Sequence, residues 1–307
     1  MSELYTDIHW QLSNYCKAEC SYCPTSLRGG EYPEEDKDYV KIAKLILDHY
    51  NLVLNRNINW TFDGGEPLDL NNLTRILKTA KSDRNNVILH TNGGYIWMDW
   101  WAIEPYVDKI VLSYHYWQNK SLIKYILDIF KEKNKSIFLK MPIRPDYFEE
   151  DMARVKITEE ENEIKVSKVI LYKNATRDGG MFSYSKEQLM ELSGIKPTKI
   201  ITIKEPEKIV PLIKEKKEFE TKPYQQRLEE KIKSNPSYLG QLCNVGIEKL
   251  VISYNGYVSG SNCNNQPLGN IWNNQWAPPD KPQICGMLSC MNKEDQKITK
   301  FTSQTQN

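Results

Sequence analysis

Cysteine is the residue whose spacing in this sequence points most directly to chemistry. The chain has 307 residues and seven cysteines, an odd number, so disulfides cannot pair all of them. The first residues show no secretory signal, so a reducing, cytoplasmic location is expected. Clustered thiols in that compartment more often bind metal or take part in catalysis. The cysteines fall into a set of three and a set of four: Cys16, Cys20 and Cys23, then Cys243, Cys263, Cys285 and Cys290.

The first set forms the motif C-x3-C-x-Y-C, directly after a β-rich run at 8–12. Three thiolates this close together can hold three irons of a [4Fe–4S] cluster and leave the fourth iron open to an outside ligand. A structural zinc ion would need four protein ligands, and no fourth Cys or His is nearby. A zinc site and an ordinary surface loop remain the alternatives at this point.

A second motif, Phe62-Asp63-Gly64-Gly65-Glu66-Pro67, follows a predicted strand at 57–62. Two consecutive glycines allow a backbone to come close to a ligand, and Glu66 could accept hydrogen bonds from an ammonium group. The same residues are also typical of a turn, which Asp63 could simply cap.

Short β-rich runs alternate with helical stretches along the first part of the chain. Helices are predicted at 36–50, 70–81 and 122–133, and strands at 8–12, 57–62, 87–90, 109–113, 136–141 and 168–172. Pro142 is predicted to end the fifth strand. This alternation indicates an α/β fold with a parallel sheet, either open or rolled into a partial barrel. In such sheets the chemistry lies at the carboxyl ends of the strands, where both motifs fall.

Together the two motifs resemble the radical S-adenosylmethionine (radical SAM) superfamily, over roughly residues 5–175. The resemblance implies a partial (βα)6 TIM-like barrel. It also implies that S-adenosylmethionine chelates the open iron of a [4Fe–4S] cluster. One-electron reduction by an external donor such as flavodoxin or ferredoxin then cleaves the sulfonium. The resulting 5′-deoxyadenosyl radical abstracts a hydrogen from the substrate.

The resemblance also assigns roles to single residues. Cys16, Cys20 and Cys23 would hold the cluster and be the catalytic residues. Gly64, Gly65 and Glu66 would face the methionine amino group, and the backbone of Tyr22 would meet the adenine.

Further positions match the superfamily at the ends of later strands. Thr91-Asn92-Gly93 resembles the TNG that ends the third strand, and Ser113 matches a ribose-binding position. Lys140 and Arg144 are candidates for the methionine carboxylate, since arginine binds carboxylates through two parallel hydrogen bonds. His115 is a candidate for contact with the substrate.

The second set of cysteines surrounds a predicted hairpin, in which 249–254 and 257–260 flank Asn255-Gly256. With Pro267–Trp272 it resembles the C-terminal SPASM and "twitch" extensions, in which a Leu-Gly-Asn-Ile run opens a helix. A full SPASM domain has seven cysteines and two auxiliary clusters. Four cysteines therefore fit a twitch-like domain with one fully ligated [4Fe–4S] cluster. A zinc site, and three ligands plus one hydrogen-donating cysteine, are the alternatives. The spacing from the hairpin to Cys263 is longer than in the usual pattern.

These assignments divide the chain into a radical SAM partial barrel at 1–195, a Lys/Glu-rich connector at 196–241, and a twitch-like α+β domain with a polar tail at 242–307. Lys and Arg number 41 and Asp and Glu number 40, a net charge of +1. This balance gives no global attraction to nucleic acid or anionic lipid. The longest apolar runs are too short to span a membrane.

The sequence therefore predicts an oxidoreductase- or epimerase-type radical SAM enzyme acting on a small molecule such as a sugar or aminocyclitol. Cys16 lies so near the start that no N-terminal peptide-recognition domain is expected. A maturase of a ribosomally made peptide, forming a thioether, a C–C crosslink or an epimer, is the first alternative. A non-catalytic zinc or nucleic-acid binding protein is the alternative from another class.

Overall fold

The computed structural model describes residues 3–23, 25–27, 30, 32, 37–94, 98–172, 182–193, 233–262, 267–273 and 276–301. Most of the predicted connector, the end of the tail, and Cys263 lie outside the described residues.

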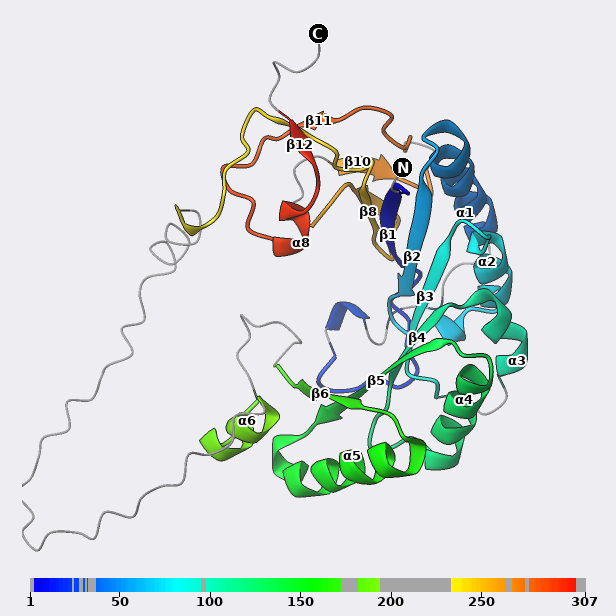
Figure 1. Cartoon of the computed structure of the whole chain (residues 1–307), viewed down its shortest axis with the longest axis vertical. Coiled ribbons are helices and arrows are strands. Elements are labelled where there is room, and N and C mark those ends of the chain that lie inside the picture. Colours follow the sequence, from blue (N-terminus) through cyan, green and yellow to red (C-terminus); the bar gives the residue numbers. More distant parts are fainter. Residues whose placement is uncertain are drawn as a thin grey trace, which may run out of the picture.

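Six parallel strands pair in sequence order and form most of one large sheet (Figure 1). The strands are β1 (Tyr5–Gln11), β2 (Asn57–Asp63), β3 (Asn86–Thr91), β4 (Lys109–Ser113), β5 (Ser136–Ile143) and β6 (Val166–Ile170). The predicted α/β class with a mainly parallel sheet is thereby confirmed, and each predicted strand overlaps an observed one.

The connecting helices all cover one face of this sheet (Figure 1). They are α1 (Tyr39–Leu47), α2 (Leu73–Ala80), α3 (Trp100–Ile103), α4 (Lys120–Glu132) and α5 (Phe148–Asn162). Alternation decides which side chains face them: in β2, Ile58, Trp60 and Phe62 are fully buried against the helices. The core lies between the sheet and these helices, and the opposite, concave face carries polar residues such as His9, Asp63 and Lys140.

Helix α1 begins at Tyr39, because Asp38 caps it by accepting a hydrogen bond from the Lys41 backbone N–H. It runs on into a π-helical turn, Asp48–Val53. After α5 and β6, the chain forms a further short helix, α6 (Lys186–Leu192), which begins with a capping box at Ser185.

Pro142 does not end β5, and that prediction is wrong. Lys140 O accepts a hydrogen bond from Tyr114 N on the β4 side, so Pro142, two residues on, faces the same side. Strand β4 has already ended at Ser113, so the missing N–H of Pro142 costs no ladder hydrogen bond.

Helix α5 was not predicted, because its buried face is partly polar. Phe148 and Val155 share that face with Asp151, Thr158 and Asn162, which are also buried. A search for apolar residues at helical spacing cannot detect such a face.

The predicted hairpin is confirmed, but it joins the large sheet. Strands β8 (Lys249–Ile252) and β9 (Tyr257–Ser259) are antiparallel, with Gly256 at φ +83° in the turn. Strand β8 also runs parallel to β1, from Asp7–Lys249 to Trp10–Ile252. The whole sheet therefore has nine strands, in the order β10-β9-β8-β1-β2-β3-β4-β5-β6.

The segment expected to open a helix is instead strand β10 (Pro267–Asn270), paired antiparallel with β9. Gly269 lies at φ +113°, a conformation outside the helical region, and it follows a shift in the pairing register.

The remaining C-terminal residues form a second, three-stranded sheet. In it β7 (Leu242–Cys243) lies between β11 (Gln283–Ile284) and β12 (Lys300–Phe301), and the short helix α8 (Lys293–Gln296) precedes β12. Among the residues described, no helix is both long and apolar enough to cross a membrane.

Candidate active site

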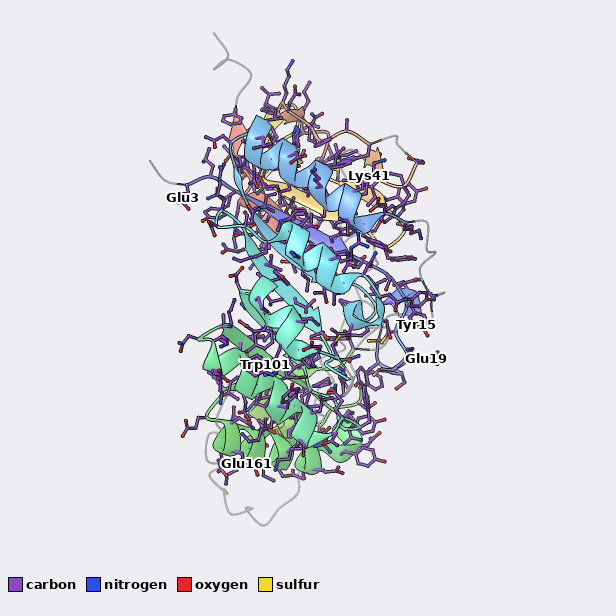
Figure 2. All side chains as sticks on the ribbon, turned by 90° about the vertical axis from the view of Figure 1, so that its right-hand side faces the viewer. Glu3, Tyr15, Glu19, Lys41, Trp101 and Glu161 are labelled. Atoms are coloured by element: carbon purple, nitrogen blue, oxygen red, sulfur yellow. The ribbon has the colours of Figure 1, made fainter. Side chains whose placement is uncertain are left out.

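The loop that carries the first three cysteines is docked on the Gly64-Gly65-Glu66 turn by backbone contacts. Gly65 N donates to Ser13 O at 2.7 Å, and Glu66 N donates to Tyr15 O at 2.8 Å. A Cβ atom at Gly65 would lie 2.0 Å from Tyr15 O, and one at Gly64, where φ is +132°, would lie 2.3 Å from Ser13 O. Both glycines are thus required by the closeness of the two backbones. Figure 2, seen from the helix side, shows Tyr15 and Glu19 of this loop at one edge of the molecule.

Cys16, Cys20 and Cys23 are all half-buried, and none of them forms a disulfide. Cys23 N donates to Cys20 O at 2.9 Å, which closes a turn between these two residues. Lys17 ties the start of the loop to the buried Asp69, through its backbone N at 3.3 Å and its Nζ at 3.6 Å.

Burial raises the pKa of Cys16 to about 11, and the carboxylates of Glu66 and Asp69 add to the effect. A thiol in this position needs a nearby cation to ionise, which a bound metal provides. Three half-buried thiols on one short loop therefore fit an iron–sulfur cluster in donor chemistry.

The Glu66 side chain has a structural role that its sequence motif did not indicate. Its side chain is 1% exposed. Oε1 accepts hydrogen bonds from Thr91 Oγ1 at 2.5 Å and Leu68 N at 3.1 Å, and Oε2 accepts one from Asn92 N at 2.7 Å. Burial raises the pKa of this carboxyl to about 7. The carboxylate is thus engaged in holding the end of β3, and contact of Gly64, Gly65 and Glu66 with a methionine amino group remains a prediction.

Asn92 connects the ends of the other strands to the cysteine loop. Its Nδ2 lies 4.0 Å from Cys16 Sγ, and its carbonyl accepts a hydrogen bond from Gln118 Nε2. Gln118 Oε1 in turn accepts a hydrogen bond from His115 N at 2.5 Å, beyond the end of β4. The segments that follow β1, β2, β3 and β4 therefore form one hydrogen-bonded layer, with the cysteines in it.

His115 is 8% exposed and lies against Tyr22, from the cysteine loop. The two rings stack at 5.8 Å, with an angle of 12° between their planes, and Tyr22 OH lies 2.5 Å from His115 Nδ1. Burial lowers the pKa of His115 to about 4 and raises the pKa of Tyr22. At neutral pH the imidazole is therefore uncharged, and its Nδ1 shares one hydrogen bond with the Tyr22 hydroxyl.

Arg144 is held by a neighbouring carboxylate. Its Nε and one terminal nitrogen donate to Asp151 at 2.9 and 2.7 Å, and Asp151 is buried. The guanidinium lies between the rings of Tyr116 and Tyr147, at 4.0 and 4.3 Å. The two guanidinium nitrogens that were expected to bind a methionine carboxylate therefore already donate hydrogen bonds to Asp151.

Lys140 and Ser113 lie side by side in register on β5 and β4, on the concave face of the sheet. Both are half-buried. Lys140 and Arg144 were both predicted to bind a carboxylate. Arg144 is paired with Asp151, whereas no carboxylate of the described residues lies within 4.0 Å of the Lys140 ammonium.

A polar pair on the concave face was missed by the sequence analysis. His9 Nε2 lies 2.6 Å from Asp63 Oδ2, between β1 and β2. Asp63, read from its sequence as a turn cap, is therefore a side-chain partner of His9. Strand alternation places both residues opposite the buried Trp10 and Phe62, a pattern that predicts their shared face but not their pairing.

Three of the four C-terminal cysteines come together. Cys243 in β7, Cys285 after β11 and Cys290 are buried and line one small cavity with Tyr238 and Lys300. Cys285 N donates to Gln241 O at 2.8 Å, which fixes this segment against the start of β7. In the part of the chain that the structure describes, no three Cys, His, Asp or Glu side chains are arranged to hold a single metal ion.

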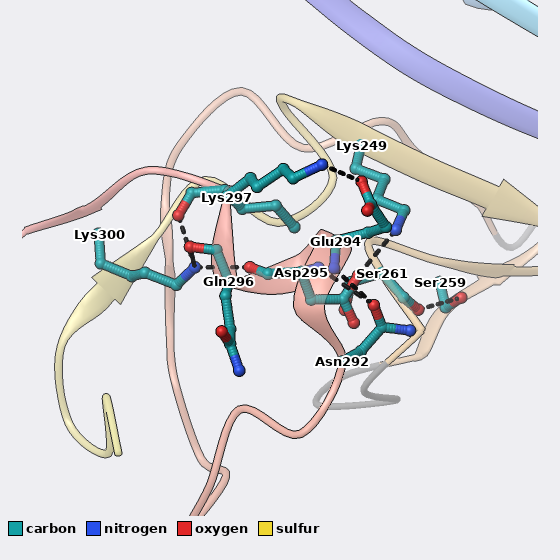
Figure 3. Close-up of polar contacts among 10 residues, drawn as sticks. Lys249, Ser259, Ser261, Asn292, Glu294, Asp295, Gln296, Lys297 and Lys300 are labelled. Atoms are coloured by element: carbon teal, nitrogen blue, oxygen red, sulfur yellow. Dashed lines mark hydrogen bonds and ion pairs between the residues drawn. The ribbon is translucent and has the colours of Figure 1, made fainter. Parts of the chain in front are cut away.

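One buried ion pair joins this region to the large sheet, and lysine contacts hold the region itself together (Figure 3). Lys249 of β8 donates to Asp295 Oδ1 of α8 at 2.8 Å, and both side chains are largely buried. Lys300 Nζ donates to the carbonyls of Asp295 and Gln296 at 2.6 and 3.1 Å, and lies 4.8 Å from the centre of the Tyr238 ring.

Comparison with solved structures finds 26 chains that match this one. No protein-family model and no curated protein matches the chain. Streptococcus suis SuiB bound to its precursor peptide SuiA superposes with a TM-score of 0.52 at 12% identity, covering 89% of this chain and 64% of SuiB. SuiB alone gives 0.50 at 16% identity, covering 87% of this chain and 63% of SuiB.

Two further solved proteins give lower scores. BtrN in complex with AdoMet and 2-DOIA gives a TM-score of 0.45 at 16% identity, covering 90% of this chain and 81% of BtrN. The enzyme anSMEcpe with bound AdoMet gives 0.49 at 14% identity, covering 88% of this chain and 78% of the other. The likeness to SuiB is one of fold, a mixed α/β fold with a mainly parallel sheet, and the chain spans less than two thirds of SuiB.

Proposed function

We propose that this protein is a radical SAM enzyme that abstracts a hydrogen from a small polar molecule, leading to oxidation or epimerisation. The observation that carries the proposal is the docking of the Cys16–Cys23 loop on the Gly64-Gly65-Glu66 turn. Two motifs that are far apart in the sequence meet there through backbone hydrogen bonds of 2.7 and 2.8 Å, at the carboxyl ends of β1 and β2.

In this proposal Cys16, Cys20 and Cys23 ligate three irons of a [4Fe–4S] cluster, and S-adenosylmethionine lies beside them. When bound, these groups supply one-electron reductive cleavage of the sulfonium and a carbon radical that removes hydrogen. The electron comes from an external donor such as flavodoxin or ferredoxin.

The chain itself positions these groups. The backbone of Gly64 and Gly65 faces the methionine amino group, and Glu66 keeps that turn joined to the end of β3. The backbone of Tyr22 faces the adenine, while its ring is held by His115. Ser113 faces the ribose. Arg144, already paired with Asp151, orients the segment after β5 beside a methionine carboxylate.

The C-terminal cysteines complete the proposal as ligands of one auxiliary [4Fe–4S] cluster in a twitch-like domain. Cys243, Cys285 and Cys290 already line one cavity, and Cys263 would be the fourth ligand. Such a cluster would take an electron from the substrate radical or bind the substrate directly. The proposed division into a barrel at 1–195, a connector at 196–241 and an auxiliary domain at 242–307 goes with this assignment.

The second candidate is a maturase of a ribosomally made peptide. It is favoured by the TM-score of 0.52 with SuiB, whose structure was solved with the precursor peptide SuiA. Both candidate functions use the cysteine loop. They differ in the substrate from which the 5′-deoxyadenosyl radical abstracts a hydrogen.

The test is to purify the protein anaerobically, measure iron, and incubate it with S-adenosylmethionine and dithionite. We expect roughly eight irons per chain if both thiolate sets hold cubane clusters. Replacing Cys16, Cys20 and Cys23 with alanine should leave about four irons and abolish formation of 5′-deoxyadenosine.

The same measurements separate the proposal from a non-catalytic zinc or nucleic-acid binding protein. That alternative predicts a colourless protein that contains zinc and does not turn over S-adenosylmethionine. If the triple variant still cleaves S-adenosylmethionine, the first cysteine set is not the catalytic one. About four irons in the unchanged protein would rule out the auxiliary cluster.

A further inference from the structure

A cavity of about 520 Å³ lies on strands β8, β9 and β10, the part of the large sheet that the C-terminal region adds. Five of the residues that line it carry a hydroxyl or an amide group: Ser253, Tyr257, Ser259, Ser261 and Asn262. Small-molecule sites typically measure about 300–1,000 Å³, so the cavity suits a ligand of that class.

The cavity lies on the concave face, beside the strand that leads into the first cysteine loop. Its wall residue Val251 is in register with His9 of β1 and with Ser259 of β9. Leu250 and Ile252 are fully buried toward the helices, so Val251 between them faces the concave side. Strand β8 is the immediate neighbour of β1 (Figure 1), and the cysteine loop follows β1. A ligand in the cavity would therefore lie on the face of the sheet, and beside the strand, to which the proposed chemistry belongs.

Polar side chains of the cavity are accessible to a ligand. Tyr257 is 61% exposed, and its hydroxyl has no hydrogen-bond partner among the described residues. Asn262 is also exposed, and within the described ranges its amide is unpaired as well. Ser259 Oγ donates to Ser261 O at 2.9 Å (Figure 3), so its oxygen can still accept a hydrogen bond. A ligand would thus meet hydrogen-bonding groups from three separate side chains.

The lining of the cavity is polar but carries no charge. No Asp, Glu, Lys, Arg or His is among the described residues that line it. A charged ligand would lose hydration there without gaining an ionic partner, which favours an uncharged ligand. The Tyr257 side chain combines an apolar ring face with a hydroxyl, so it can pack against the C–H face of a ring compound and bond its hydroxyl groups.

We propose that this cavity binds the substrate, and that the substrate is an uncharged ring compound with several hydroxyl groups. The ring of Tyr257 packs against its C–H face, and Ser259 and Asn262 form hydrogen bonds with its hydroxyls. The inference rests on the proposed function and narrows it, because it selects a neutral polyol over an amine, an acid or a peptide.

The test is calorimetric titration of the anaerobically prepared holoprotein, with S-adenosylmethionine present and no reductant. Methyl glucoside and myo-inositol are the neutral probes, glucosamine is the cation and glucuronate is the anion. The capped peptide acetyl-Gly-Ser-Gly-amide represents a peptide substrate. We expect methyl glucoside to bind at least about tenfold more tightly than glucosamine, glucuronate or the peptide.

Replacing Tyr257 tests its contact with the ligand. Tyr257→Ala should weaken binding of methyl glucoside about tenfold, since it removes both the ring and the hydroxyl. Tyr257→Phe keeps the ring and should weaken binding only about threefold. Tyr125 on the outer helix α4 is 42% exposed, so Tyr125→Ala is the matched control and should bind the probes as the unchanged protein does. Circular dichroism shows whether each variant is folded.

A second variant changes the selectivity and does not depend on Tyr257. Asn262→Asp places a carboxylate in the cavity with almost no change in shape. It should raise the affinity for glucosamine about two- to fivefold and leave that for methyl glucoside unchanged. Asn71, an exposed residue that precedes α2, provides the control, because Asn71→Asp makes the same chemical change outside the cavity.

Three results would overturn the proposal: neither neutral probe binds, a charged probe or the peptide binds most tightly, or Tyr257→Ala and Asn262→Asp bind every probe like their controls. Failure of the proposed function has a separate signature. It appears as absence of 5′-deoxyadenosine in the unchanged protein with S-adenosylmethionine and dithionite, whatever the titrations show.

Discussion

Tyr22 and His115 show how a single contact orients the cysteine loop. Tyr22 lies between Cys20 and Cys23, and its ring stacks on His115 at 5.8 Å while its hydroxyl bonds Nδ1. His115 is in turn fixed by Gln118, so the loop after β1 is oriented by the segment after β4. The position of Cys20 and Cys23 thus depends on a residue more than ninety positions away.

Replacing His115 tests this contact. His115→Leu should remove the hydrogen bond between the half-buried Tyr22 hydroxyl and the imidazole, at a cost of about 1 kcal/mol in the free energy of unfolding. His115→Gln keeps an acceptor and should lose less. Urea denaturation of the two variants gives the comparison, and equal losses would show that only ring packing matters.

His115 should also make the protein less stable in acid. Its pKa is about 4 in the folded chain, against about 6.5 when unfolded. Between these values the unfolded chain binds more protons, so the free energy of unfolding rises with pH across this window and falls as the pH drops. The loss from pH 7 to pH 5 should be about 1–2 kcal/mol from this residue. It should be absent in His115→Gln, and denaturation at both pH values measures the difference.

Single residues were predictable where local spacing carries the information. The cysteine loop and the Gly-Gly turn were found from their motifs. The partners of Arg144 and Asp63 were not, because Asp151 lies on an unpredicted helix and His9 on a different strand. Such pairs depend on which strands are neighbours in the sheet, and the sequence of one strand does not contain information about its neighbours.

At the scale of elements, the Gly65 turn and the cysteine loop form one unit. Gly65→Ala would place a methyl group 2.0 Å from Tyr15 O, so the loop must move. We expect a loss of about 1–3 kcal/mol in stability and a lower iron content after reconstitution.

Gly240→Ala is the matched control, because a Cβ atom there meets nothing within 4 Å although φ is +78°. It should cost about 1–2 kcal/mol for the left-handed backbone alone, with the iron held by the Cys16–Cys23 loop unchanged. Equal iron content in both variants would show that the two loops are not coupled.

The first turn of α5 provides another element-scale test. Asp151 accepts hydrogen bonds from the backbone N and side chain of Arg144, and its side chain is 2% exposed. Asp151→Ala should cost roughly 3–5 kcal/mol, since it removes the buried partner of the guanidinium and leaves only the exposed Glu150 near it.

Glu150, the neighbouring residue, is 60% exposed and lies 3.7 Å from the same guanidinium. Glu150→Ala should therefore cost under about 1 kcal/mol. Thermal denaturation of both variants measures the contrast, and similar melting temperatures would contradict the assignment of Asp151 as the anchor.

At the scale of the whole molecule, the sequence predicts a domain boundary at about residue 195. Hydrogen bonds nevertheless join residues before this boundary to residues of the C-terminal region. Thr6 Oγ1 donates to Ile247 O at 2.6 Å, and the buried Tyr50 hydroxyl donates to Gly246 O. Strand β8 covers the edge of β1. The mainly parallel sheet was predictable from alternation, but this closure was not, because β8 reads as part of an isolated hairpin.

A chain ending at residue 195 should therefore not fold stably. It would expose the β1 edge and leave the Thr6 and Tyr50 hydroxyls without their acceptors. The full chain should unfold in a single transition followed by circular dichroism and by tryptophan fluorescence. A soluble fragment with its own cooperative transition would show instead that 1–195 is an independent domain.

Because β1 is paired on both sides, one strand fixes both groups of cysteines. The first group follows its carboxyl end, and the second is attached through β8, whose register with β1 runs from Asp7–Lys249 to Trp10–Ile252. The separation of the two groups is thus set by backbone pairing and not by the length of chain between them. A guest domain inserted between residues 193 and 233 should therefore leave the β1–β8 pairing in place, and with it the separation of Cys16 from Cys243.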